Sequence, residues 1–387
     1  MTRYRGGVRL PGDPVRRRRV LALLGVVAGI AVAVGLVLAA GGGGASDEPR
    51  LGSAPASTAP QLPLRDAVGQ TLVMAFDGTT APEYIRRRLR NGEGAGVILF
   101  GGNVVDPAQL RRLTRTIQRA AGGGALIATD QEGGEIRNVP FAGPVAGQSA
   151  QATPRAAGAA AAEAARGLRR TGVNVNLAPV ADVEPASGGG ALPGRLYPGS
   201  AREVAAATTA ALSAHARARV AATVKHFPGL GRATVNTDDG PATIDATRAE
   251  FEATDLEPYR AAVAADAPLV MAGHALYPAF DRERIASQSP TLLTDLLRDQ
   301  LGFRGVTITD SIEAQAVLDR SGVATAAIRS IAAGADIVLM TGSGSWNLVY
   351  PRLLRRARND PEFAARVRES ARRVLELKRR LGLDVGR

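Results

Sequence analysis

Polar side chains that could catalyse a reaction follow five apolar runs of the sequence. They are Asp130-Gln131-Glu132, Asp182, Lys225-His226, His274 and Asp310. Asp310 ends the run VTIT, where a carboxylate could act as a nucleophile or general base, or could simply cap the next helix. Lys225 and His226 could donate hydrogen bonds to substrate hydroxyls, or the lysine could be buried beside an acid. Because the chain has only two lysines, we favour the functional interpretation of this pair.

Two further strings have both a functional and a structural interpretation. Asp130 and Glu132 stand beside Gly133-Gly134, which indicates a tight loop where a ligand can approach the backbone, or merely a turn. His274 could contact a ligand or be a buried structural histidine. The three histidines are widely spaced and cysteine is absent, so we expect no metal site. Nucleotide-binding glycine motifs are also absent from the sequence, and we expect no organic cofactor.

The apolar runs predict the elements that must position these side chains. Eight continuous runs are typical of parallel strands covered on both faces, and they span residues 70–76, 95–100, 125–129, 173–178, 221–227, 269–272, 306–309 and 337–340. Amphipathic helical segments between them include residues 106–121, 156–171, 201–219, 291–301 and 322–333. This alternation predicts an α/β fold, either a (β/α)8 TIM-type barrel or a doubly wound sheet. Polar residues after five of the eight runs favour the barrel, whose sites use several strand ends.

The N-terminal part has a different composition. The 387-residue chain has a net charge of +12, and residues 1–19 contain seven arginines against one acid. Residues 20–40 have no charged or polar side chain and are long enough to span a bilayer, with the arginines on the cytoplasmic side. We favour an uncleaved transmembrane helix over a signal peptide, whose apolar core is usually shorter. Residues 41–63 are a linker rich in Gly, Pro and Ser, and residues 64–387 form the folded domain.

The position of the positive charge argues against nucleic-acid binding. Half of the net charge lies in the basic flank before the apolar segment, where it acts as an orientation signal for export. The remainder is spread over more than 360 residues. We therefore expect a domain outside the cytoplasm, held at the cell membrane by the N-terminal helix, or secreted if that segment is cleaved.

Taken together, the motifs resemble glycoside hydrolase family 3, in its single-barrel β-N-acetylglucosaminidase branch. The matching strings follow the family order, with DQEGG at 130–134, NLAPVADV at 176–183, KHFPG at 225–229, MAGH at 271–274, GVTITDS at 305–311 and AGADIVLM at 333–340. The resemblance implies a retaining mechanism in which Asp310 is the nucleophile. It also implies that Asp130, Lys225 and His226 contact sugar hydroxyls.

The resemblance further implies that an arginine contacts the sugar. Arg195, in GRLYPGS, is the first candidate for this arginine, and Arg137, after DQEGG, is the second. We include His274, from the MAGH string, among the candidate substrate-binding residues. The expected partner is therefore a carbohydrate, with a β-linked amino sugar or glucoside in the site.

One loop departs from the family pattern. The branch carries KHFPGHG and then Asp-Ser-His, in which the last histidine is the acid/base and the aspartate orients it. Here Leu230 stands at the first histidine, Asn236 at the aspartate and Asp238 at the last histidine, followed by Asp239. Asp238 or Asp239 could replace the imidazole if its pKa is raised. Otherwise the barrel has lost turnover.

These inferences predict an exported retaining glycosidase that removes terminal β-N-acetylglucosaminyl, or related β-glycosyl, residues from cell-wall-type glycans during peptidoglycan turnover. The alternative is a catalytically impaired barrel that binds cell-wall glycan or a partner. The two hypotheses share one site, so turnover distinguishes them and binding does not.

Overall fold

Eight parallel strands close into a barrel in the computed structural model, which describes residues 62–386 except residues 186, 187 and 189. Their order around the barrel is β1-β12-β11-β8-β7-β6-β3-β2. They are β1 (Leu72–Met74), β2 (Gly96–Ile98), β3 (Leu126–Thr129), β6 (Val175–Asn176), β7 (Ala221–Phe227), β8 (Leu269–Ala272), β11 (Val306–Ser311) and β12 (Ile337–Met340). The ring closes between β1 and β12, with Leu72 opposite Val338. The predicted barrel is confirmed and the doubly wound sheet is excluded.

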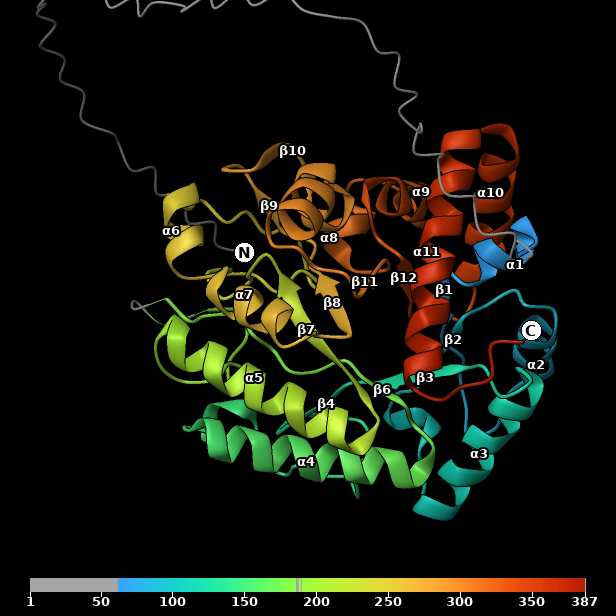
Figure 1. Cartoon of the computed structure of the whole chain (residues 1–387), viewed down its shortest axis with the longest axis horizontal. Helices are drawn as coiled ribbons and strands as arrows, with labels where there is room; N and C mark the ends of the chain where they lie inside the picture. The colour runs from blue at the N-terminus through green and yellow to red at the C-terminus, as the bar shows by residue number, and fades with distance from the viewer. Residues whose placement is uncertain (1–61, 186–187, 189, 387) are drawn as a thin grey trace, which may run out of the picture. The chain divides into compact units, whose positions relative to one another are not determined.

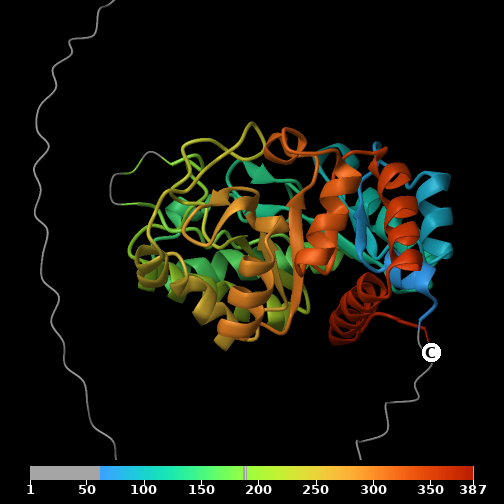
Figure 2. The same ribbon diagram turned by 90° about the horizontal axis from the view of Figure 1, so that it is seen from above.

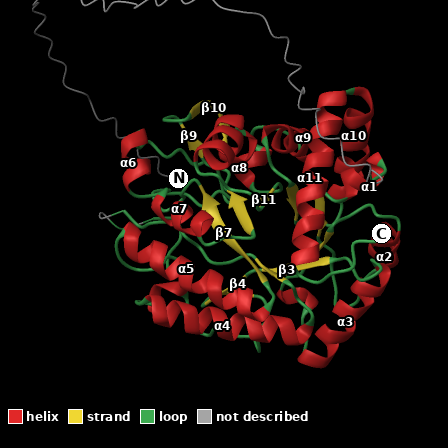
Figure 3. Ribbon diagram, in the orientation of Figure 1, coloured by secondary structure: helices red, strands yellow, loops and turns green. Residues whose placement is uncertain are grey.

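Helices surround the strands (Figures 1, 2 and 3). They are α1 (Leu64–Gly69), α2 (Glu83–Arg90), α3 (Pro107–Ala120), α4 (Pro154–Thr171), α5 (Ala201–Ala218), α6 (Arg248–Ala253), α7 (Glu257–Ala264), α8 (Gln315–Leu318), α9 (Val323–Ala333), α10 (Ser345–Asn359) and α11 (Pro361–Arg380). A π-helix, η4 (Thr291–Gln300), and short 3₁₀ turns, η1 (Gly101–Asn103), η2 (Gln148–Ala150) and η3 (Ala286–Gln288), complete the fold.

Local sequence signals set the ends of several helices. Asp106 accepts hydrogen bonds from the first backbone N–H groups of α3, which also begins with a proline. Ser200 and Glu203 form a reciprocal capping box at the start of α5. Helix α4 ends at Thr171 and is capped by Gly172, whose positive φ of 84° is readily adopted by glycine. These helix ends determine where the chain turns back towards the next strand.

Apolar side chains fill the barrel and close one of its ends. Val73, Met271 and Ile308 belong to the apolar cluster inside the barrel. Residues in and just after α11 belong to the same cluster. They are Val374 and Leu377 of α11 and Leu381, which follows the helix. Lys378 of α11 donates to Gln70 just before β1, so the helix lies at the amino-terminal ends of the strands. The carboxyl ends of the strands remain available for a site.

Two short antiparallel ribbons extend the loops after β3 and β8. The first pairs β4 (Gln131–Gly133) with β5 (Ile136–Arg137), and the second pairs β9 (Leu276–Tyr277) with β10 (Asp281–Ile285). These strands of two to five residues contain mostly polar side chains, so no apolar run predicts them. The first ribbon carries the DQEGG string to the edge of the barrel.

The predicted membrane helix at residues 20–40 lies outside the described residues. Within residues 62–386, leaving out the three undescribed positions, no helix has the length and apolar character needed to cross a membrane.

Candidate active site

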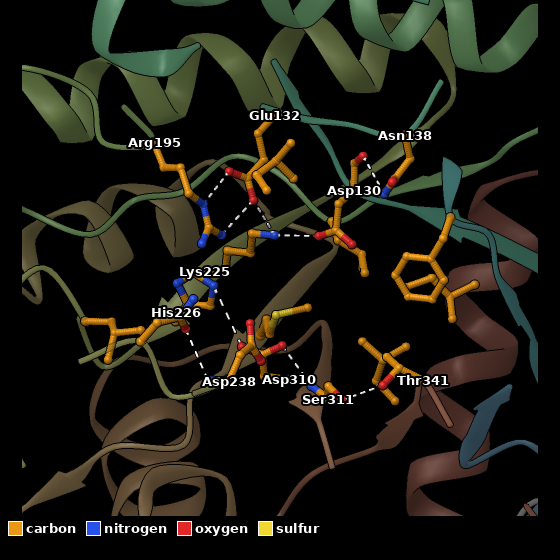
Figure 4. Close-up of a pocket in the computed structure, with 18 of the residues that line it drawn as sticks. Asp130, Glu132, Asn138, Arg195, Lys225, His226, Asp238, Asp310, Ser311 and Thr341 are labelled. Carbon is orange, nitrogen blue, oxygen red and sulfur yellow. Dashed lines mark hydrogen bonds and ion pairs between the residues drawn. The ribbon is translucent and has the colours of Figure 1, made fainter. Parts of the chain in front are cut away.

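A cavity of about 420 Å³ lies at the carboxyl ends of the barrel strands (Figure 4). Polar side chains from β3, β4, β7, β11 and the following loops surround it, and apolar side chains from the strands form its floor. The lining residues include Ile98, Phe100, Asp130, Glu132, Asn138, Leu177, Arg195, Lys225, His226, Leu230, Asn236, Asp238, Met271, Asp310, Ser311, Leu339 and Thr341. The polar residues predicted from five different strand ends thus meet around one end of the barrel.

Asp310 projects into this cavity from β11. Its Oδ1 accepts a hydrogen bond of 2.8 Å from the Ser311 backbone N–H, and its Oδ2 lies 3.8 Å from His226 Nε2. Burial alone would raise the pKa of Asp310. The His226 imidazole and the Lys225 ammonium act in the opposite direction and hold this pKa below its usual value. Asp310 is therefore an ionised carboxylate, as a nucleophile must be.

His274 lies behind Asp310 and is absent from the cavity lining. Its Nε2 is 2.8 Å from the Ser311 carbonyl oxygen and its Nδ1 is 2.7 Å from Ser287 Oγ. A carbonyl can only accept, so Nε2 carries the proton. Burial lowers the pKa of His274, and the neutral ring accepts at Nδ1 from the Ser287 hydroxyl. His274 therefore anchors the strand end that carries Asp310.

A chain of alternating charges forms the opposite wall of the cavity (Figure 4). Lys225 Nζ lies 2.6 Å from Asp130 Oδ1 and 2.7 Å from Glu132 Oε1. Arg195 donates two hydrogen bonds of 2.9 Å to the two oxygens of Glu132. Burial alone would raise the pKa of Glu132, but Lys225 and Arg195 lower it to about 2. The four side chains hold one another in fixed positions, which suits recognition of several hydroxyls.

His226 is oriented by the fully buried carboxylate of Asp182. Its Nδ1 donates to Asp182 Oδ2 at 2.7 Å, while the backbone N–H groups of His226 and Leu230 both donate to Asp182 Oδ1. These contacts leave His226 Nε2 free to face the cavity and Asp310. The peptide bond between Lys225 and His226 is cis, and both side chains line the cavity.

Asp238 lies on the same side of the cavity as Asp310 (Figure 4). It is at the exposed rim, where partial loss of solvent around its carboxyl group and the negative charge of Asp310 raise its pKa. Its loop is attached to α8 because Gln315 N–H donates to the Asp238 carbonyl at 3.1 Å. Asp239 is exposed and is not among the residues that line the cavity. Of the two candidate acids, the structure brings Asp238 to Asp310.

The two candidate arginines differ in position. Arg195 reaches the cavity, whereas Arg137 lies in β5 and does not line it, although its neighbours Ile136 and Asn138 do. Asn138 donates to the Asp130 carbonyl and accepts from the Gly101 N–H.

The sequence did not assign roles to Glu132 in the cavity or to Asp182 behind it. Glu132 is part of the DQEGG string and Asp182 of NLAPVADV, so their place after a strand was the available signal. The hydroxyls of Ser311 and Thr341 lie 2.6 Å apart beside Asp310, and single hydroxyl residues at strand ends give no such signal.

Comparison with known proteins identifies the family. The profile described as "Glycosyl hydrolase family 3 N terminal domain" matches residues 64–377. An "Uncharacterized secreted glycosyl hydrolase" of Arthroderma benhamiae is 34% identical over 349 residues, covering 85% of this chain and 97% of the relative. The chain belongs to glycosyl hydrolase family 3. The resemblance seen in its motifs is thereby confirmed, and this family 3 protein is a glycosidase.

Relatives of this family 3 glycosidase include named hexosaminidases. A "Beta-hexosaminidase" of Xanthomonas oryzae pv. oryzae is 34% identical over 280 residues, covering 70% of this chain and 83% of the relative.

Solved structures with related folds carry similar names. A family 3 β-N-acetylglucosaminidase from Paenibacillus sp. FPU-7 aligns with a TM-score of 0.77 and 31% identity, covering 84% of this chain and 64% of that one. A β-N-acetylhexosaminidase from Beutenbergia cavernae aligns with a TM-score of 0.75 and 32% identity, covering 82% and 98%. The family 3 glycosidase described here is thus similar to β-N-acetylglucosaminidases in sequence and fold.

Proposed function

We propose that this family 3 glycosidase removes terminal β-N-acetylglucosaminyl residues from cell-wall-type glycans with retention of configuration. The observation that carries the proposal is the position of Asp310, an ionised carboxylate at a strand end in a cavity lined by hydroxyl-binding groups. Asp310 attacks the anomeric carbon and forms a glycosyl ester, which water then hydrolyses. Because β11 and the Ser311 N–H hold the carboxylate, the attack needs little reorganisation.

The sugar hydroxyls bind to the charged wall of the cavity. Lys225 and Arg195 donate hydrogen bonds, Asp130 accepts them, and His226 Nε2 faces the space between this wall and the nucleophile. Such charge-assisted hydrogen bonds favour ligands with several hydroxyls in defined directions. No metal or organic cofactor takes part in the proposed reaction.

Asp238 is the proposed acid/base. Its raised pKa favours the protonated form, which donates a proton to the leaving oxygen when Asp310 attacks. The resulting Asp238 carboxylate then accepts a proton from the water that cleaves the glycosyl ester. Both carboxyl groups return to their starting states after each cycle.

The second candidate function is glycan binding without turnover. Two observations favour it: Asp238 is exposed at the rim, and Asn236 stands in place of an orienting carboxylate. An acid that is poorly held contributes less to catalysis, and general acids typically contribute 10²–10⁴-fold.

We also propose that the barrel works outside the cytoplasm. Residues 1–19 would form the cytoplasmic flank, residues 20–40 a transmembrane helix or cleaved signal, residues 41–63 a linker, and residues 64–387 the catalytic domain. Export is supported by the Arthroderma benhamiae relative, which is named as a secreted glycosyl hydrolase. Fractionation of cells, with protease treatment of intact spheroplasts, tests the location and the presence of the anchor.

Turnover of aryl glycosides by the full-length protein tests the catalytic proposal. We expect hydrolysis of an aryl β-N-acetylglucosaminide and slower hydrolysis of the aryl β-glucoside. The Asp310→Ala variant should hydrolyse neither substrate faster than the uncatalysed reaction. A fluorinated sugar should leave a covalent adduct on Asp310, seen by mass spectrometry. Sugar binding with no turnover above the Asp310→Ala blank would support the second candidate and contradict the first.

Azide rescue identifies the acid/base. With a leaving group that needs no protonation, Asp238→Ala should stall at the glycosyl ester, and added azide should restore turnover and yield a β-glycosyl azide. Asp239→Ala is the matched control and should behave like the unchanged protein. Rescue by azide of the Asp239→Ala variant alone would assign the acid/base role to Asp239 and contradict its assignment to Asp238.

A further inference from the structure

A second cavity, of about 580 Å³, lies at the end of the barrel opposite the catalytic site. Its walls come from the segments that precede β1, β2 and β3, from α11 and from the last described residues. Its lining includes Gln70, Leu89, Arg90, Gly94, Arg119, Ala121, Leu375, Lys378 and Asp384. Nothing in the proposed glycosidase reaction uses this cavity.

Lys378 in this cavity is buried with almost no charge compensation. The residue is 3% exposed, and its Nζ donates to the neutral Oε1 of Gln70 at 2.7 Å. Among the described residues, no carboxylate lies within ion-pair distance of this amine, whereas Lys225 contacts two. Burial lowers the pKa of Lys378 to about 7, so much of this amine is unprotonated at neutral pH.

The other charged side chains around the cavity favour an anionic ligand. They are Arg90, Arg119 and Asp384, so two cations face one anion. Arg90 also contacts Glu83, while the described partner of the Arg119 guanidinium is the Thr116 hydroxyl. A guanidinium without a carboxylate partner is well suited to bind a phosphate or carboxylate group.

We propose that this cavity binds a small carbonyl compound bearing a phosphate or carboxylate group, and that Lys378 is the amine with which it forms an imine. The unprotonated Nζ attacks the carbonyl carbon and forms the C–N bond. The carbonyl oxygen takes up both protons of the amine nitrogen and leaves as water, while the nitrogen forms the C=N double bond. No oxidant or reductant is required for this step. Arg119 contributes by binding the anionic group of the compound.

Labelling with pyridoxal 5′-phosphate tests the proposal on the full-length protein. Borohydride reduces any imine to a stable secondary amine, and peptide mass spectrometry then reports each site. Because the chain has only two lysines, we expect the adduct on Lys378 and none on Lys225, with the N-terminal amine resolved separately. Labelling of Lys378 should rise with pH between about 6 and 8. Equal labelling of both lysines, or none of Lys378, would overturn the proposal.

Matched variants and a second reagent separate reactivity from anion binding. Lys378→Met should lose the adduct and keep its glycosidase activity. Arg119→Gln should reduce labelling of Lys378 at least several-fold. Arg115→Gln, on the exposed surface of the same helix α3, should leave the labelling unchanged. Pyridoxal, which lacks the phosphate, should label the unchanged protein several-fold more slowly. Equal rates with both reagents would exclude an anion-binding cavity and overturn that part of the proposal.

Discussion

At the residue scale, the opposite pKa shifts of Asp310 and Asp238 predict the pH dependence of hydrolysis. Asp310 must be ionised, and its lowered pKa places the acidic limb of the profile below the usual range of a carboxyl group. Asp238 must be protonated, and its raised pKa places the alkaline limb above that range. We therefore expect a bell-shaped profile of kcat/KM with an acidic optimum, measured with an aryl β-N-acetylglucosaminide. In Asp238→Asn the alkaline limb should disappear; a limb unchanged in that variant would contradict the assignment.

Restoring the histidine that the family branch carries should move the alkaline limb. In Asn236→Asp with Asp238→His, an imidazole replaces the carboxyl group as the acid, and the ordinary pKa of histidine is about 6.5. We expect the optimum of kcat/KM to shift towards neutral pH by at least one unit. The single change Asp238→His is the control, since its imidazole lacks the orienting carboxylate and should be less active than the double variant.

Sequence reasoning found the side chains of the site that occur in conspicuous strings. Asp130, Lys225, His226 and Asp310 all reach the cavity, and their roles stay predictions. The sequence did not decide whether Asp238 or Asp239 faces the nucleophile, because neighbouring residues of a loop point their side chains in different directions.

Two other features of the site, the contact of Asp182 and the position of Arg137, became known only from the folded chain. Asp182 orients His226 across 44 positions, which only a folded chain reveals. Arg137 remains a predicted substrate contact that lies outside the cavity of this structure.

At the scale of the elements, a glycine in β2 allows the close pairing of two barrel strands. A Cβ at Gly96 would lie 1.9 Å from the Leu126 carbonyl oxygen in β3. Gly96→Ala should therefore lower the free energy of unfolding by about 1–3 kcal/mol or more, because both strands would have to move. Chemical denaturation measures this change.

Gly102→Ala is the matched control for this substitution. A Cβ at Gly102 would meet no atom within 4 Å, and the glycine lies in the exposed turn that follows the same strand. We expect little change in this variant. Similar stability of the two variants would show that β2 and β3 do not constrain position 96.

All eight barrel strands lie within or overlap the predicted apolar runs, because a strand covered on both faces needs apolar side chains throughout. Their ends were less predictable. Only Val175–Asn176 of the run at residues 173–178 forms β6, since the following residues turn towards the cavity. The segment at 291–301 was predicted to be helical and is a π-helix, a difference in winding that side-chain periodicity over ten residues does not reveal.

For the molecule as a whole, Lys378 makes the free energy of unfolding depend on pH above neutrality. Its pKa is about 7 in the folded protein and near 10.5 in an exposed lysine, so the unfolded chain binds more protons between these values. The free energy of unfolding should therefore rise with pH over this window, with a contribution approaching about 1.4 kcal/mol per pH unit. Denaturant titrations from pH 7 to 10 measure the slope. Lys378→Met should remove this contribution, and an identical slope in the variant would contradict the shifted pKa.

The pairing of β1 with β12 has a consequence for how the protein is made. Leu72 cannot meet Val338 until nearly the whole domain has been synthesised, so the first strand keeps an unpaired edge while more than 260 residues are added. If the chain is exported as we propose, this edge must be protected from aggregation during translocation. Ring closure would then be the last step of folding, completed outside the cell membrane when the end of the chain emerges.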